Sequence, residues 1–112
     1  MIKLSDFIFR HLVEAHAIEH CFLVTGGGAM HLNDSLGKYI PYVCNHNEQA
    51  TSISAEGYAR TSEKVGVVLV TSGPGYTNTL TGIANAYSDS TPLVVLAGDV
   101  PTSCKNGKYS KT

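Results

Sequence analysis

The segment Val65-Gly66-Val67-Val68-Leu69-Val70, followed by Thr71-Ser72-Gly73-Pro74-Gly75, decides the fold class of this chain. Its first half is a nearly continuous aliphatic and β-branched run. It lacks the polar alternation of a half-exposed strand, so it predicts a strand covered on both faces, as in a parallel sheet. The glycines and the proline of its second half end that strand in a turn.

Helix and strand patterns alternate along the rest of the chain. Short apolar runs predict three more strands, over 21–24, 41–44 and 93–97. Apolar residues at helical spacing predict helices over about 5–17, 29–36, 48–60 and 77–87. Ser5 is expected to cap the first helix and Gly37 to end the second. Buried strands alternating with helices predict an α/β fold with a doubly wound parallel sheet.

The helix over 48–60 shows a face of mostly small residues that would allow close approach to the sheet. The residues that share this face are Ala50, Ile53, Ser54, Gly57 and Tyr58.

Three segments follow strands at the carboxyl edge of the predicted sheet, where such folds bind ligands. They are the glycine run 26–28, the segment 45–48 and the turn 72–75. The glycine run does not complete a dinucleotide fingerprint, because His31 stands where the third glycine should be. The turn at 72–75 lacks the lysine of a phosphate-binding loop and the surroundings of a nucleophile elbow. It could simply be a turn in which Thr77 or Asn78 caps the next helix.

Glu48 is the most informative single residue, because it follows a buried strand and begins a helix. Two interpretations stay open. An acidic side chain in the first helical turn is favoured by the helix dipole. Alternatively, a carboxyl group in a dry crevice could handle a proton. The nearby His46 could line the same pocket or simply sit at the strand end.

Composition excludes several functional classes. Net charge is −1 and charged residues make up 15% of the 112 residues, so neither nucleic acid nor an anionic membrane is an expected partner. Cys21, Cys44 and Cys104 match neither zinc nor disulfide spacing, and the first two are expected to be core thiols of a reduced, cytoplasmic protein. The amino-terminal residues show no signal-peptide or membrane-spanning pattern.

An ordered series of motifs resembles the N-terminal domain of acetolactate synthases and related thiamine-diphosphate enzymes. The resemblance spans about residues 4–102. It rests on Asn47-Glu48-Gln49, Ala55-Glu56-Gly57-Tyr58-Ala59-Arg60, Val67 to Gly75, Thr77-Asn78, Thr81-Gly82-Ile83-Ala84, Ala86-Tyr87, Asp89-Ser90, Pro92-Leu93-Val94, Gly98 and Val100-Pro101-Thr102. It implies that residues 1–102 are the first part of a pyrimidine-binding domain. The lysine-rich residues 103–112 are expected to be a loop or frayed tail.

The resemblance also implies roles for individual residues. Glu48 would hydrogen-bond N1′ of the cofactor's aminopyrimidine and promote loss of the proton at C2 of its thiazolium ring. Pro74, Gly75 and Asn78 would line the pyrimidine pocket. Gly26 and Gly27 would approach the thiazolium side, where backbone N–H groups could meet a developing oxyanion. The activity implied is decarboxylation of a 2-oxo acid and joining of the product to a second carbonyl.

The sequence departs from the family pattern at two positions and also lacks one family signature. Many relatives have histidine directly before the glutamate, where this chain has Asn47, and Val24-Thr25 replaces tyrosine-proline before the glycines. No Gly-Asp-Gly signature for magnesium is present, so no metal ligand is expected here. The expectation is a fragment that is inactive alone and needs the magnesium–diphosphate domain of the same or another subunit, in a homo-oligomer. The alternative is a non-catalytic remnant or interaction module. FAD binding stays open but has no support in the sequence.

Overall fold

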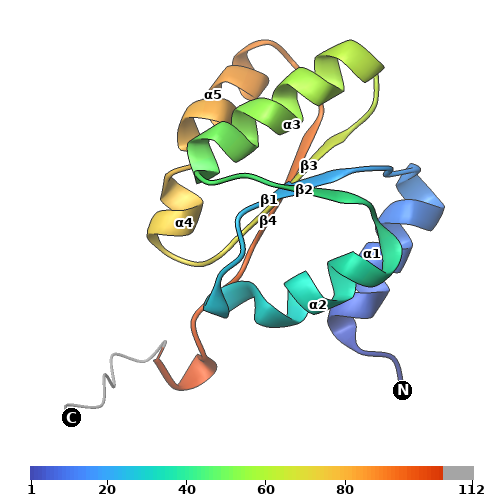
Figure 1. Cartoon of the computed structure of the whole chain (residues 1–112), viewed down its shortest axis with the longest axis vertical. Helices are drawn as coiled ribbons and strands as arrows, with labels where there is room; N and C mark the ends of the chain where they lie inside the picture. Colours follow the sequence, from blue (N-terminus) through green and yellow to red (C-terminus); the bar gives the residue numbers. More distant parts are fainter. Residues whose placement is uncertain (105–112) are drawn as a thin grey trace.

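The structure, a computed structural model, describes residues 1–104 and forms a four-stranded parallel sheet between two layers of helices (Figure 1). The elements follow one another as α1 (Leu4–His16), β1 (Cys21–Leu23), the 3₁₀ turn η1 (Gly27–Ala29), α2 (Met30–Tyr39), β2 (Tyr42–Cys44), α3 (Glu48–Ser62), β3 (Gly66–Val70), α4 (Pro74–Thr77), α5 (Leu80–Ser88), β4 (Leu93–Ala97) and the 3₁₀ turn η2 (Thr102–Cys104). The strand order is β2-β1-β3-β4. The predicted α/β class with a doubly wound parallel sheet is confirmed.

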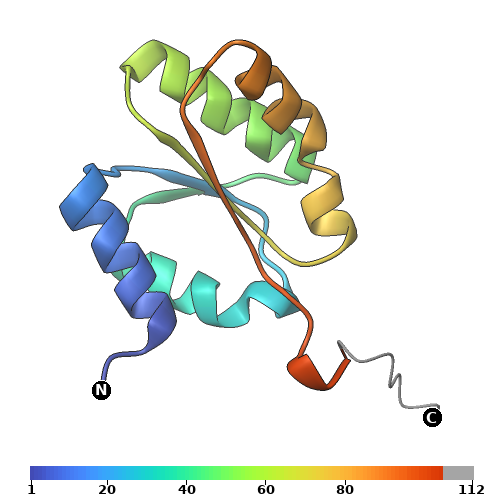
Figure 2. The ribbon, with the colours of Figure 1, turned by 180° about the vertical axis from the view of Figure 1, so that it is seen from behind.

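Helices α1 and α2 cover one face of the sheet, and α3, α4 and α5 lie on the other, as Figure 2 shows from behind. The central strand β3 is buried along its whole length, as predicted from its unbroken apolar run. Because side chains alternate along a strand, Val67 and Leu69 join the core beneath α1 and α2. Val68 and Val70 join the core beneath α3. The sheet therefore holds both helical layers in place. Because its strands are parallel, their carboxyl ends all lie on the same side of the sheet.

The predicted limits of the first two helices were partly wrong. Helix α1 begins after Lys3, and Ser5 lies inside it, where its buried hydroxyl accepts a hydrogen bond from Ser35 at 2.8 Å. Helix α2 runs through Gly37 to Tyr39. It stops there because Ile40 precedes Pro41, which forces its predecessor into the extended conformation that Ile40 adopts.

The face of α3 that packs inward also differs from the prediction. The buried residues are Thr51, Ser52, Ala55, Glu56 and Ala59. The expected face is mostly exposed, with Ile53 in solvent and Tyr58 only half-buried against Phe22. Small residues do make the contact, as expected, but they are a different set, since apolar content alone does not reveal the orientation of a helix this rich in alanine and serine.

The helix expected over 77–87 begins later, as α5 (Leu80–Ser88), and a separate short helix, α4 (Pro74–Thr77), precedes it. Gly73 has a positive φ of 61°, Pro74 then starts the short α4, and Asn78 ends it, so neither Thr77 nor Asn78 caps α5. Cys44 is exposed, not buried, because β2 is an edge strand. Strand β4 is the other edge and is only half-buried. Of the expected tail, residues up to Cys104 form η2 and residues 105–112 lie outside the described part.

Candidate functional site

Glu48 is the first residue of α3 and lies just beyond the carboxyl end of β2, as predicted. Asn47 caps the helix, its side-chain oxygen accepting from the backbone N–H groups of Gln49 at 2.9 Å and Ala50 at 3.2 Å. This cap fixes the first turn of the helix. Glu48 is half-buried, and its Oε2 accepts a hydrogen bond of 2.9 Å from Nδ2 of Asn78.

The turn after β3 forms the wall facing Glu48. Gly75 is buried, and a β-carbon placed there would lie 3.6 Å from Oε1 of Glu48. A hollow of about 410 Å³ opens here, lined by Glu48, Pro74, Gly75, Thr77 and Asn78. Four of the predicted site residues therefore meet in one place. One of the two interpretations of Glu48 placed its carboxyl group in a dry crevice. In the described residues the hollow is open, since Asn78 is exposed and Glu48 only half-buried.

The glycine run forms a second loop at the same edge of the sheet. A β-carbon at Gly26 would lie 2.5 Å from Cβ of Thr71, so only glycine fits that position. The N–H of Gly28 donates to Oγ1 of Thr71 at 3.1 Å. Gly27 faces open space, with nothing within 4 Å of a β-carbon placed there. Gly26 and Gly27 do not line the hollow beside Glu48, but Thr71 lies against both Gly26 and the hollow-lining Gly75.

Comparison with known proteins identifies the family of this chain. A family model described as "Thiamine pyrophosphate enzyme, N-terminal TPP binding domain" matches residues 2–111. The chain belongs to this family. The resemblance predicted from the motifs is thereby confirmed.

Several acetolactate synthase subunits are similar to this TPP-binding domain. The isozyme 3 large subunit of Escherichia coli (strain K12) is 45% identical over 105 residues, which cover 92% of this chain and 18% of that protein. The large subunit of Lactococcus lactis subsp. lactis (strain IL1403) is 48% identical over 98 residues, covering 86% and 17%. The chain thus spans less than a fifth of the length of these relatives.

Thr71 lies beside the candidate site, although the sequence did not indicate it as a site residue. It directly follows the buried strand β3, and its side chain contacts both the glycine run and the turn that carries Gly75. The sequence did contain an indication of these contacts, because glycines at positions 26, 28 and 75 are typical of places where another group lies close to the backbone. The identity of the approaching side chain depends on how the loops meet.

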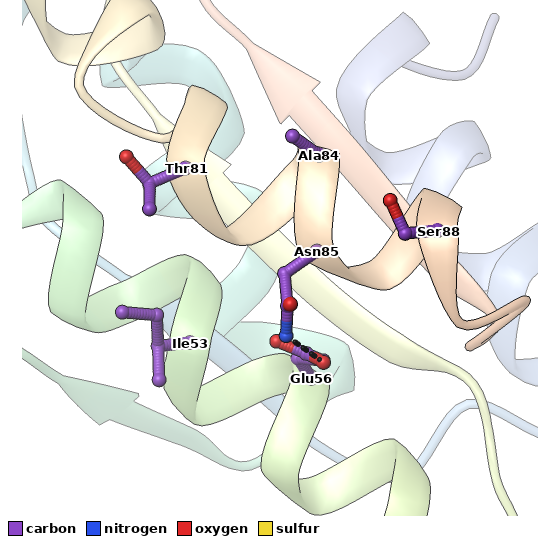
Figure 3. A pocket seen from close by; sticks show the side chains of 6 residues that line it. All are labelled: Ile53, Glu56, Thr81, Ala84, Asn85 and Ser88. Atoms are coloured by element: carbon purple, nitrogen blue, oxygen red, sulfur yellow. Dashed lines mark hydrogen bonds between the residues drawn. The ribbon is translucent and has the colours of Figure 1, made fainter.

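A second hollow of this domain, about 460 Å³, lies between α3 and α5 and is drawn in Figure 3. Its carboxylate, Glu56, is buried and already paired. Oε1 of Glu56 accepts from Asn85 Nδ2 at 2.6 Å and from Arg60 Nε at 2.8 Å. Such a paired carboxylate joins two helices and leaves little capacity for a ligand.

Two absences hold for the described residues of the domain. Within residues 1–104, no group of three or more histidine, cysteine, aspartate or glutamate side chains is placed to hold a metal ion. Over the same residues, no helix combines the length and apolar character needed to cross a membrane.

Proposed function

We propose that this chain forms the pyrimidine side of a thiamine-diphosphate site in an acetolactate synthase-like enzyme, with Glu48 as the residue that activates the cofactor. The observation that carries the proposal is the arrangement around the Glu48 carboxylate. Asn78 donates to Oε2, while Oε1 faces the buried Gly75 and has no hydrogen-bond partner among the described residues. Asn78 thus holds Oε2 in place, and Oε1 is available to hydrogen-bond a ligand.

The hollow beside Glu48 fits an aminopyrimidine ring. Such a ring is flat and carries nitrogen atoms on its edge, so it needs an acid for the edge and a wall without bulky side chains. Glu48 provides the acid, and Pro74 and Gly75 provide the wall. When bound, thiamine diphosphate supplies the electron sink for decarboxylating a 2-oxo acid and for joining two carbonyl carbons.

The residues of the chain orient the reacting groups. The Asn78 amide fixes the rotamer of Glu48, so that Oε1 can share a proton with a ring nitrogen in the hollow. On the other loop, the N–H groups of Gly26 and Gly27 donate to no acceptor in residues 1–104. They are therefore available to a developing negative charge on a substrate oxygen.

The rest of the proposed site lies outside the described residues. Magnesium and the diphosphate would be held by a second domain of the same or another subunit, in a homo-oligomer. The substrate class is a 2-oxo acid.

The test is a chimera in which this chain replaces the matching 105 residues of the E. coli isozyme 3 large subunit. We expect an active enzyme. Glu48→Gln should still bind thiamine diphosphate but slow exchange of its C2 proton by on the order of 10² to 10⁴, because the amide keeps the shape and cannot relay a proton. Exchange is followed by NMR in deuterated water.

Glu63→Gln is the matched control, since it makes the same chemical change on an exposed residue at the end of α3. It should leave exchange unchanged. Equal exchange rates in Glu48→Gln and the parent chimera would refute Glu48 as the activator. The isolated chain should show no cofactor binding in calorimetry even with magnesium, because the diphosphate and its ion carry much of the attraction.

A further inference from the structure

We propose that Thr71 is a positioning residue that sets the separation between the glycine loop (26–28) and the turn that carries Gly75, and hence the shape of the cofactor site. The inference rests on the proposed function. It follows from the contacts of one side chain, whose Cβ, Oγ1 and Cγ2 lie against Gly26, Gly28 and Gly75.

The first contacts are with the glycine loop. Cβ of Thr71 occupies the space beside Gly26, where a second β-carbon would be only 2.5 Å away. Oγ1 accepts the Gly28 N–H at 3.1 Å. The loop is therefore held against Thr71 both by its shape and by a hydrogen bond. This leaves the N–H groups of Gly26 and Gly27 unpaired in residues 1–104.

The third contact is with the opposite loop. Cγ2 of Thr71 would be 2.6 Å from a β-carbon at Gly75, and the same β-carbon would lie 3.6 Å from Oε1 of Glu48. The methyl group of Thr71 thus lies behind the backbone that faces the catalytic carboxylate. A shift of this methyl group would move Gly75 relative to Glu48.

Thr71 is suited to this task because it is rigid. It directly follows the fully buried β3, so its backbone is anchored by the centre of the sheet. Its β-branched side chain has a restricted χ1. Because displacement of reacting groups by about 1 Å can cost roughly 100-fold in rate, the separation that Thr71 sets bears directly on catalysis.

The first experiment, in the full-length chimera, adds a methyl group at a glycine and removes the facing methyl group of Thr71. Gly75→Ala should lower the thermal unfolding midpoint and weaken cofactor binding. The double variant Gly75→Ala/Thr71→Ser should recover both, because serine lacks Cγ2 and the next atoms lie at 3.6 Å. Thr71→Ser should not rescue Gly26→Ala, because the clash there is with Cβ at 2.5 Å, which serine retains.

The second experiment removes only the hydrogen bond. Thr71→Val keeps the shape and loses the acceptor for Gly28, so we expect kcat to fall about 10-fold to 100-fold with little change in the cofactor Kd. Thr71→Ser keeps the acceptor for Gly28 but lacks Cγ2, so its kcat should lie between those of Thr71→Val and the parent. Thr61→Val, an exposed threonine of α3, is the control and should match the parent.

The outcomes separate this inference from the proposed function. If Glu48→Gln slows proton exchange but Thr71→Val is indistinguishable from Thr61→Val, Glu48 keeps its role as activator and Thr71 has no positioning role. Failure of Thr71→Ser to rescue Gly75→Ala, in unfolding midpoint and in Kd, also overturns the inference. The rescue by volume exchange tests it even if Thr71→Val folds poorly.

Discussion

At the scale of single residues, the site depends on pairs far apart in sequence. Glu48 and Asn78 are 30 positions apart, and Gly28 and Thr71 are 43 apart, yet each pair shares a hydrogen bond. They meet because β1, β2 and β3 are parallel neighbours whose carboxyl ends lie at one edge of the sheet. Each residue has ordinary chemistry, and the site comes from their juxtaposition.

The two strand cysteines allow a prediction at this scale. Burial raises the pKa of the Cys21 thiol to about 12, whereas Cys44 is exposed on the edge strand. A raised thiol pKa means that the folded state resists ionisation, so Cys21 stays protonated and unreactive until the pH approaches that value. At pH 8, iodoacetamide should modify Cys44 in the folded chain and Cys21 only after unfolding. Mass spectrometry of the peptides measures this, and equal labelling rates for the two cysteines would contradict the packing of β1.

At the scale of elements, α3 packs closely on its neighbours because glycines face it. A β-carbon at Gly82 of α5 would lie 2.3 Å from Oγ of Ser52, and one at Gly66 would lie 2.3 Å from the carbonyl oxygen of Ala55. These close approaches bring α3 against both α5 and β3. The position of Glu48 at the start of α3 follows from this packing.

Two glycine-to-alanine substitutions test that packing. Gly82→Ala should destabilise the fold by about 1–3 kcal/mol, because its clash with Ser52 involves a β-carbon that cannot rotate away. Gly57→Ala, on the exposed face of α3 with open space around it, should be neutral or stabilising by up to about 1 kcal/mol through helix propensity. Urea unfolding measures both. The opposite ranking would mean that α3 and α5 are not packed in this way.

At the scale of the whole molecule, the sheet has two strand edges and an apolar surface that faces solvent. Strand β2 exposes Tyr42 and Val43 along one edge. On the layer of α3 and α5, Ile53, Leu80 and Tyr87 are exposed. Unpaired strand edges and exposed apolar side chains both favour association with further chain.

We therefore expect the isolated chain to self-associate or to be poorly soluble. Analytical ultracentrifugation should show dimers or larger species at micromolar concentration. Val43→Lys should reduce the association, because a charged residue on an edge strand opposes pairing. Thr61→Lys adds the same charge on exposed α3 away from that edge and should have less effect. A stable monomer in the unmodified chain would refute this prediction.

The local sequence pattern was sufficient for the class of fold and for the place of the proposed activator. The unbroken apolar run of β3 and the turn after it are local features. The position of Glu48, between β2 and the helix that it begins, is also a local feature. The motifs, which form one ordered series, were enough to identify the family. The predicted helix boundaries were wrong where tertiary contacts outweighed a local preference. Ser5, for example, was expected to cap α1 but lies inside it, where it forms a buried hydrogen bond with Ser35.

Tertiary structure alone decided which face of α3 is buried, that β2 is an edge strand with Cys44 exposed, and that Thr71 joins the two loops of the site. The physical reason is the same in each case. Burial and contact between distant residues depend on strand order and on how closely helices approach the sheet. Side-chain periodicity along one segment indicates that the segment has a buried face. Which residues of other elements cover that face depends on how those elements pack.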